Sequence, residues 1–162
     1  MRQLVLLRHE KATPGSNTGE DFDRPLAQRG RDDAPVVGRA LAEAGAAPQV
    51  VLVSAARRTR ETWELVAASF QMATVRYVDK LYLAPGDLIM REAEESGVAN
   101  VMVIAHNPGL HELASRLAHR LNAMESRVRA KFPTAAAAFF TRKDDHSSWK
   151  LQDYITPKDA TD

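Results

Sequence analysis

The sequence predicts a layered α/β fold with a mostly parallel central sheet. Three apolar runs support this prediction, because residues 3–7, 50–54 and 100–105 lack the polar alternation of half-exposed strands. A segment with helical spacing follows each of these three strands, so strands alternate with helices over the first 120 residues. The chain has 162 residues, and we expect it to form one domain over residues 1–162.

The first half of the chain adds a loop and two helices to these strands. Residues 13–23 are rich in acids and turn formers, which predicts a loop. Helical spacing runs over 26–44, where Pro35 predicts a fresh start or a kink. Apolar residues recur at helical spacing from Trp63 to Phe70, so a second helix is expected after the strand at 50–54.

The second half is predicted from the same signals. It should contain a short strand at 75–78, a helix at 85–95 and a second helix at 110–121, which carries Leu110 to Leu121. Residues 134–142 and 149–154 are predicted to be two edge strands that form a hairpin. Residues 156–162 are predicted to be a frayed tail.

Composition excludes several classes of function. Lys and Arg total 22 against 21 Asp and Glu, so the net charge of +1 argues against nucleic acid or a membrane surface as a partner. The absence of cysteine excludes disulfides, thiolate metal sites and cysteine-based phosphatase chemistry. No segment approaches the roughly 18 apolar residues of a membrane span, and we expect a cytoplasmic protein.

Polar side chains follow each of the three strong strands. The first strand ends in Arg8-His9, the second ends in Ser54 and leads to a cluster of arginines, and the third is followed by His106-Asn107-Pro108-Gly109. The arginines are Arg57, Arg58 and Arg60. Because ligands of parallel sheets bind at the carboxyl ends of the strands, we expect these side chains to meet.

Each feature also has a structural explanation. A lone histidine at a strand end is more often structural than catalytic, an arginine cluster is often a solvated face, and Asn107-Pro108 is an ordinary helix start with Asn107 as N-cap. Two histidines with several arginines beside two helix N-termini instead predict a site for a dianion. A neutral imidazole could then attack phosphorus, and a second, protonated histidine could stabilise the charge. No metal or other cofactor is expected, because His111 and His119 lie eight residues apart.

Four motifs resemble the histidine phosphatase (phosphoglycerate mutase-like) superfamily, and among its members the SixA-type phosphohistidine phosphatases. They are Leu7-Arg8-His9 and the segments DRPLAQRG (23–30), VSAARRTRET (53–62) and VIAHNPG (103–109). The resemblance implies a three-layer sandwich of the phosphoglycerate mutase-like type. It also implies that His9 is the nucleophile, that His106 is the second catalytic histidine, and that Arg8 and Arg58 form the phosphate pocket. Arg24 and Asn107 are then expected to bind substrate.

The sequence departs from the family at two places. Glu10 stands where the family commonly has Gly or Ala, and we expect its side chain to pair with Lys11 as a bystander. The general acid of larger members is also missing, because residues 80–85 and Asn107 supply no carboxylate. Glu10, Asp23 and Asp79 are the substitutes that the sequence offers.

The missing acid favours phosphohistidine on a protein as the substrate. An alkoxide leaving group needs a proton donor, whereas the imidazole of phosphohistidine is readily protonated by water. The short chain, without the insertions that cap small substrates in larger relatives, also favours a protein partner. Two alternatives remain open at this point: a small phosphorylated metabolite or phosphopeptide as the substrate, and a phosphate-binding module without turnover.

Overall fold

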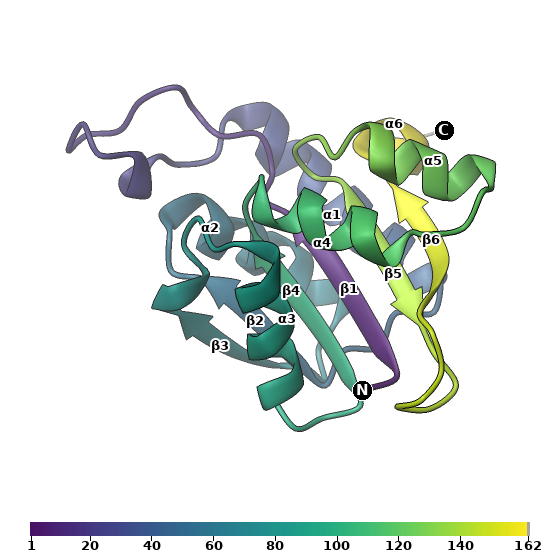
Figure 1. Cartoon of the computed structure of the whole chain (residues 1–162). Helices are drawn as coiled ribbons and strands as arrows, with labels where there is room; N and C mark the ends of the chain where they lie inside the picture. The colour runs from purple at the N-terminus through teal and green to yellow at the C-terminus, as the bar shows by residue number, and fades with distance from the viewer. Residues whose placement is uncertain (162) are drawn as a thin grey trace.

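The computed structural model describes residues 1–161 and consists of a six-stranded sheet with helices on both faces (Figure 1). The strands are β1 (Gln3–Arg8), β2 (Val50–Ser54), β3 (Thr74–Val78), β4 (Asn100–Ala105), β5 (Ala137–Thr141) and β6 (Lys150–Ile155). The α-helices are α1 (Gln28–Glu43), α2 (Arg57–Val66), α3 (Gly86–Glu95), α4 (Gly109–Leu117), α5 (Ala123–Ala130) and α6 (Pro157–Thr161). Three 3₁₀ turns are η1 (Asp21–Asp23), η2 (Ala67–Ser69) and η3 (Asp79–Leu81).

The sheet is mixed, with the strand order β3-β2-β4-β1-β5-β6. The four strands from β3 to β1 are mutually parallel, and β5 runs antiparallel to both β1 and β6. The prediction of a mostly parallel sheet is confirmed. The register pairs Arg8 with Ala105, so the ends of β1 and β4 deliver the next residues of each strand to the same edge. The expected hairpin forms, but of its two strands β5 lies inside the sheet and β6 alone is at an edge.

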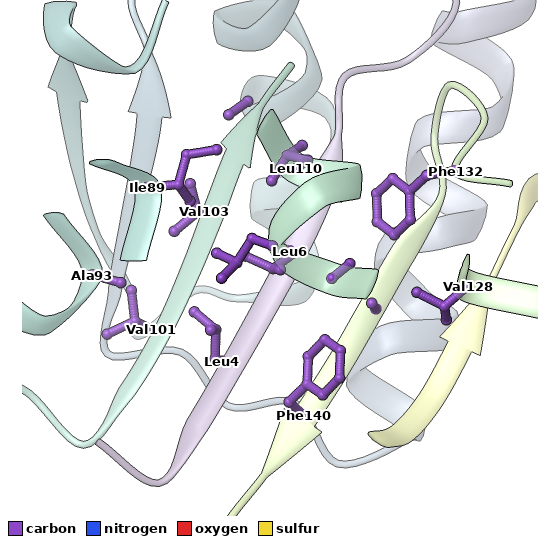
Figure 2. Close-up of a cluster of buried hydrophobic side chains, with 14 of the residues drawn as sticks. Leu4, Leu6, Ile89, Ala93, Val101, Val103, Leu110, Val128, Phe132 and Phe140 are labelled. Carbon is purple, nitrogen blue, oxygen red and sulfur yellow. The ribbon is translucent and has the colours of Figure 1, made fainter. Parts of the chain in front are cut away.

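Alternate residues of the central strands divide the core into two clusters. Leu4 and Leu6 of β1 face α3, α4 and α5, and Figure 2 shows them among Ile89, Leu110 and other residues of this cluster. Val5 and Leu7 face the opposite cluster, which includes residues of α1 and α2. Because a strand covered on both faces has no polar side, this layering explains the continuous apolar runs in the sequence.

The helices differ from the sequence-based expectations at Pro35 and at Leu121. Pro35 lies inside a continuous α1, so the fresh start that it suggested does not occur, whereas the alternative of a kink stays a prediction; the loss of one backbone hydrogen bond is offset by burying Val37 and Leu41. Leu121 belongs to no helix and is 98% exposed, because α4 ends at Leu117 and a new helix, α5, follows.

The expected frayed tail is also wrong for residues 156–161, because Pro157–Thr161 form α6. Asp159 accepts hydrogen bonds from the backbone and hydroxyl of Thr156 and pairs with Arg127 of α5 at 2.8 Å. These contacts hold the segment against the rest of the molecule. Asp162 lies outside the described residues. No helix among residues 1–161 is both long and apolar enough to cross a membrane.

Two glycines permit close backbone contacts near the carboxyl ends of the parallel strands. A Cβ on Gly30 of α1 would lie 2.3 Å from the carbonyl oxygen of Lys11, two residues after His9. A Cβ on Gly109 would lie 1.8 Å from the carbonyl oxygen of Ala84. Neither distance is compatible with a side chain, so both glycines let a helix approach the backbone of a strand-end loop.

Candidate active site

Three parallel strands bring two histidines and an arginine together at their carboxyl ends. His9 follows β1, His106 follows β4, and Arg58 lies in the first turn of α2 just after β2. The two imidazole rings have centroids 5.4 Å apart and are tilted by 51°. Both histidines and Arg58 are buried, with 7%, 2% and 3% of their surface exposed. The structure therefore brings together the side chains that the strand ends predicted.

The contacts of His9 determine which of its nitrogens can react. His9 Nδ1 lies 2.7 Å from the backbone carbonyl oxygen of Glu10. A carbonyl oxygen can only accept, so Nδ1 carries the hydrogen and Nε2 carries the lone pair in the neutral ring. The backbone of His9 is held as well, since its N–H donates to Ala105 and its carbonyl accepts from Ala135. A fixed ring with an unprotonated Nε2 is what a nucleophile requires.

His106 has the opposite tautomer. Arg58 Nη2 lies 3.2 Å from His106 Nδ1, and because a guanidinium only donates, Nδ1 is the acceptor. Nε2 therefore carries the hydrogen and donates to Ser54 Oγ at 2.7 Å. A neutral His106 cannot yet donate from Nδ1 to a phosphate oxygen.

Burial keeps both rings neutral at physiological pH. Desolvation, with the nearby charges of Arg58 and Arg8, lowers the pKa of His9 to about 3. Desolvation also lowers the pKa of His106 to about 3, together with the neighbouring His9 and Arg58. The sequence-based mechanism needs a neutral His9 and a protonated His106, and both roles stay predictions. Burial first, and then the neighbouring His9 and Arg58, disfavour the protonated form of His106 in the absence of an anion.

Arg8 and Asn107 both bind the loop between α5 and β5. Arg8 Nη1 and Asn107 Nδ2 donate to the carbonyl oxygen of Phe132 at 3.1 and 2.8 Å. The structural alternative for Asn107, a helix N-cap, does not occur, because α4 begins at Gly109 without a side-chain cap; its role in substrate binding stays a prediction. Arg8 Nε and Asn107 Oδ1 are buried without hydrogen-bond partners among the described residues. Burial and the charge of Arg58 lower the pKa of Arg8.

A carboxylate that the sequence did not single out lies among the cations. Asp21 of η1 accepts hydrogen bonds from Arg58 at 3.1 Å, from Arg24 at 2.9 Å and from the Tyr82 hydroxyl at 2.6 Å. The Tyr82 bond, followed by those from the arginines, holds the pKa of Asp21 well below its usual range. Tyr82 also packs edge-on against His106, with ring centroids 5.5 Å apart. The loop at 13–23 thus places an ionised carboxylate at the site.

The other charged candidates lie elsewhere. Arg57 pairs with Glu61 along α2 at 2.8 Å, so of the three clustered arginines Arg58 is the one that contacts His106. Asp23 accepts a hydrogen bond from Thr18 within its own loop. Asp79 is exposed at the start of η3, and among the described residues no hydrogen bond connects it to either histidine. Neither Asp23 nor Asp79 is arranged as a proton donor.

Glu10 does not pair with Lys11, and that expectation is wrong. Its side chain is fully buried, and neither carboxyl oxygen has a hydrogen-bond partner among the described residues. Burial, with the nearby carboxylate of Asp33, raises the pKa of Glu10 to about 9. The side chain is therefore neutral at physiological pH and does not repel a phosphate.

A short hydrogen-bonded chain connects the segment after His9 to α2. The backbone N–H of Glu10 donates to Thr62 Oγ1 at 3.1 Å, and that hydroxyl donates to the carbonyl oxygen of Arg58 at 2.8 Å. The carbonyl of Glu10 is the group that orients His9. Thr62 thus holds the segment after β1 in register with the helix that carries Arg58.

Sequence reasoning missed the roles of Asp21, Tyr82, Ser54 and Thr62. Ser54 and Thr62 could have been found, because both belong to the motif VSAARRTRET (53–62) that contains Arg58. Asp21 and Tyr82 come from irregular segments, where no spacing signal indicates the direction of a side chain. In residues 1–161, no group of three or more His, Cys, Asp and Glu side chains is arranged to hold a metal ion.

Comparisons with known proteins agree with this geometry. Residues 4–82, which include Arg8, His9 and Arg58, match the histidine phosphatase superfamily (branch 1). The protein Rv1276c of Mycobacterium tuberculosis is 34% identical over 137 residues, covering 82% of this chain and 84% of the relative. The SixA structure from Agrobacterium tumefaciens superposes with a TM-score of 0.82 at 27% identity, covering 96% of this chain and 98% of that chain. The SixA structure from Nakamurella multipartitia gives 0.81 at 28% identity, covering 96% of each chain.

Proposed function

Because the chain belongs to the histidine phosphatase superfamily, we propose that it is a phosphohistidine phosphatase acting on histidine side chains of proteins. The two similar SixA structures carry the provisional name phosphohistidine phosphatase, which supports this substrate. The observation that carries the proposal is the pair of histidines. His9 is neutral with an unprotonated Nε2, and its ring centroid lies 5.4 Å from that of His106, beside the buried guanidinium of Arg58.

The first chemical step transfers the phosphoryl group to His9. The lone pair of Nε2 forms a bond to phosphorus while the bond from phosphorus to the substrate nitrogen breaks. Arg8 and Arg58 stabilise the charge on the equatorial oxygens, since guanidinium forks match phosphate geometry. The dianion raises the pKa of His106, which takes up a proton and donates it in a hydrogen bond to the same oxygens. The substrate nitrogen takes a proton from water as its bond to phosphorus breaks, so a neutral imidazole and a hydroxide ion are released.

The second step releases phosphate from the enzyme. Water attacks phosphorus, the bond to His9 Nε2 breaks, and the product leaves as dihydrogen phosphate, which keeps both protons of the attacking water. Arg8, Arg58 and His106 stabilise the charge on its oxygens until it leaves. The hydrogen bond from His9 Nδ1 to Glu10 keeps the leaving ring in place, so it is ready for the next cycle. None of these steps needs a metal, because arginines and a histidine supply the positive charge.

The proton inventory of the site supports a nitrogen leaving group. The carboxylate near the histidines is Asp21, and its lowered pKa keeps it ionised, so it is a poor proton donor. Tyr82 occupies the segment in which the sequence analysis sought an acid, and its hydroxyl proton is committed to Asp21. Phosphohistidine can react at such a site, whereas an alkyl phosphate lacks the donor that its leaving oxygen needs.

The test compares substrates that differ in their leaving group. Phosphate release is measured from a protein phosphorylated on histidine with phosphoramidate, from an aryl phosphate and from phosphoserine. We expect the first two to react and phosphoserine to be slower by about 10²–10⁴, the usual contribution of a general acid. Equal rates for phosphoserine would overturn the substrate assignment, and they would favour a small phosphorylated metabolite or phosphopeptide.

The same assay separates an enzyme from a phosphate-binding module. The reaction is stopped rapidly at alkaline pH, because phosphohistidine is labile in acid. If the protein is an enzyme, labelled phosphate should then be found attached to it. His9→Ala should abolish both turnover and labelling, while His119→Ala, which changes an exposed histidine, should change neither. Turnover of His9→Ala within tenfold of the parent would remove His9 from the mechanism.

A further inference from the structure

A basic pocket lies beside the candidate active site at the same edge of the sheet. Its volume is about 520 Å³, within the range of sites that bind small ligands or short peptide segments. It is lined by residues from the loop after β1, from α1, from α5 and the loop that follows it, from the end of β6 and from the start of α6. Figure 1 shows α5 and α6 next to each other at the head of β6, where this pocket is formed.

The pocket and the histidines occupy neighbouring parts of one edge. The histidines lie over β1 and β4, and the pocket lies over the ends of β1 and β6 on the other side of β1. Lys11 of the pocket is two residues from His9 in the chain. Thr134 of the pocket precedes Ala135, whose N–H donates to the carbonyl of His9 at 3.0 Å. These connections place the pocket beside the segment that carries His9.

The lining is strongly positive although the whole chain is nearly neutral. Five cations line it, Lys11, Arg29, Arg127, Lys131 and Lys158, against the single carboxylate of Asp33. The whole chain carries a net charge of only +1. Positive charge is thus concentrated beside a site that is itself built for an anion.

Two of these cations are already paired, and two others are available. Arg127 binds Asp159 at 2.8 Å, and Arg29 lies 3.6 Å from Asp33. The ammonium groups of Lys11 and Lys131 are exposed and have no hydrogen bond or ion pair with any described residue. They stand on different walls of the pocket.

We infer that this pocket binds acidic side chains that flank the phosphohistidine of a protein substrate. The inference rests on the proposed function and specifies its substrate as a phosphohistidine in an acidic segment. Two lysines on flexible stems suit separate carboxylates, whereas a second phosphate is typically held by arginine forks and backbone N–H groups. The arginine forks of this pocket already bind carboxylates of the chain. The rings of Tyr154, Pro133 and Pro157 supply apolar surface for the peptide backbone and side-chain stems.

A binding experiment tests the pocket without relying on phosphatase activity. A fluorescein-labelled peptide with a central histidine and several flanking glutamates, not phosphorylated, is titrated with the protein and followed by anisotropy. Its matched control has glutamine in place of each glutamate. We expect the acidic peptide to bind about tenfold more tightly at low salt and to lose this advantage at high salt.

Charge variants locate the binding on the molecule. Lys131→Glu should weaken acidic-peptide binding about tenfold and Lys11→Gln about threefold, because each removes one of the available cations. Arg76→Glu, which changes an exposed cation on β3 at the opposite edge of the sheet, should change it less than about twofold. The glutamine peptide should respond to none of these changes.

Two outcomes would overturn the inference while leaving the phosphatase proposal standing. One is equal binding of the acidic and glutamine peptides. The other is binding of tripolyphosphate to the pocket, measured by calorimetry, while the acidic peptide shows no measurable binding. That result would assign the pocket to phosphate groups. Conversely, acidic-peptide binding that depends on Lys131 in a protein without turnover would retain the pocket and reject the enzyme.

Discussion

Arg58 Nη2 donates a hydrogen bond to Asp21 Oδ2 at 3.1 Å, so the guanidinium that we place on the phosphate is already bound to a carboxylate. Arg24 binds the other oxygen of the same carboxylate at 2.9 Å. A phosphate that approaches His9 must therefore compete with Asp21 for the arginines. This competition gives the loop at 13–23 a direct influence on the affinity of the site for anions.

Asp21→Asn should increase the affinity for an oxyanion. The amide keeps the size of the side chain and removes the charge that competes for Arg58 and Arg24. We expect the Kd for sulfate, measured by titration calorimetry, to fall about threefold to tenfold, as for a partly exposed ion pair. Asp23→Asn is the matched control, because Asp23 lies in the same turn and bonds to Thr18 instead. Weaker sulfate binding by Asp21→Asn would show that Asp21 orients Arg58 rather than competing for it.

Oxyanion binding should be coupled to proton uptake at His106. Its pKa is lowered to about 3 in the protein by itself, and a dianion beside the ring should raise it towards neutrality. A group that gains a proton on binding makes affinity fall as pH rises through its new pKa, so sulfate should bind more weakly at pH 8 than at pH 6. Sulfate itself does not titrate in this range.

Calorimetry in two buffers of different ionisation enthalpy measures that uptake directly. We expect up to about one proton per sulfate near pH 6 in the parent protein and close to none in His106→Asn. No uptake by the parent would mean that His106 stays neutral and that the arginines alone stabilise the charge on phosphate.

The two histidines and Arg58 could be predicted from the sequence because they follow buried parallel strands. Such strands are recognisable as apolar runs, and their carboxyl ends converge by topology, so adjacent strand ends predict adjacent side chains. Asp21 and Tyr82 could not be predicted in this way. Asp21 lies in the 3₁₀ turn η1 and Tyr82 directly follows the 3₁₀ turn η3, and in such segments side-chain direction depends on long-range contacts such as the hydrogen bond between them.

The errors in the helices have a related cause. Leu121 fits the spacing of α4, but spacing does not determine where a helix ends, and the chain leaves the helix at Ala118. Glu10 and Lys11 are neighbours of opposite charge, which suggested a pair. The side chain of Glu10 instead enters the interior, a choice made by the packing of α1 against the segment after β1. Local sequence contains no signal for such packing.

Thr62→Val should slow the chemistry without changing the fold. Valine fills the same volume but cannot accept from the Glu10 N–H or donate to the Arg58 carbonyl. With these two bonds lost, His9 and Arg58 are less well aligned, and we expect kcat to fall about tenfold with little change in KM. Thr62→Ser should restore most of the rate because it keeps the hydroxyl. Equal losses in both variants would point to packing of the methyl group, and an unchanged kcat in Thr62→Val would remove Thr62 from the positioning of His9.

Removal of metal ions should leave activity intact. Among the described residues no cluster of His, Cys, Asp and Glu could hold an ion, and the proposed mechanism places Arg8, Arg58 and His106 on the phosphate oxygens. Hydrolysis of an aryl phosphate after dialysis against EDTA should match that of untreated protein. A loss that a divalent ion restores would require a metal in the chemical step.

Glu10→Gln should stabilise the protein, and the gain should increase with pH. Burial raises the pKa of Glu10 in the folded protein from 4.5 to about 9, so folding suppresses its ionisation. Below pH 4.5 the carboxyl is protonated in both the folded and unfolded states and costs no ionisation free energy. Between that pH and about 9 the unfolded chain ionises while the folded protein does not, so stability is progressively lost as pH rises. Glutamine keeps the shape and the buried polar atoms but cannot ionise.

The measurement is the free energy of unfolding in urea at pH 5 and pH 8. We expect the parent and Glu10→Gln to be similar at pH 5, and the variant to be more stable at pH 8 by on the order of 2 to 3 kcal/mol. Glu43→Gln, which changes an exposed residue of α1, controls for the general effect of removing a negative charge. Turnover of aryl phosphate and of phosphoserine should be unaffected by Glu10→Gln, because the groups that orient His9 are the backbone atoms of residue 10. A selective loss with phosphoserine would instead identify Glu10 as the proton donor, and a stability difference that does not change with pH would show that its carboxyl ionises normally in the folded protein.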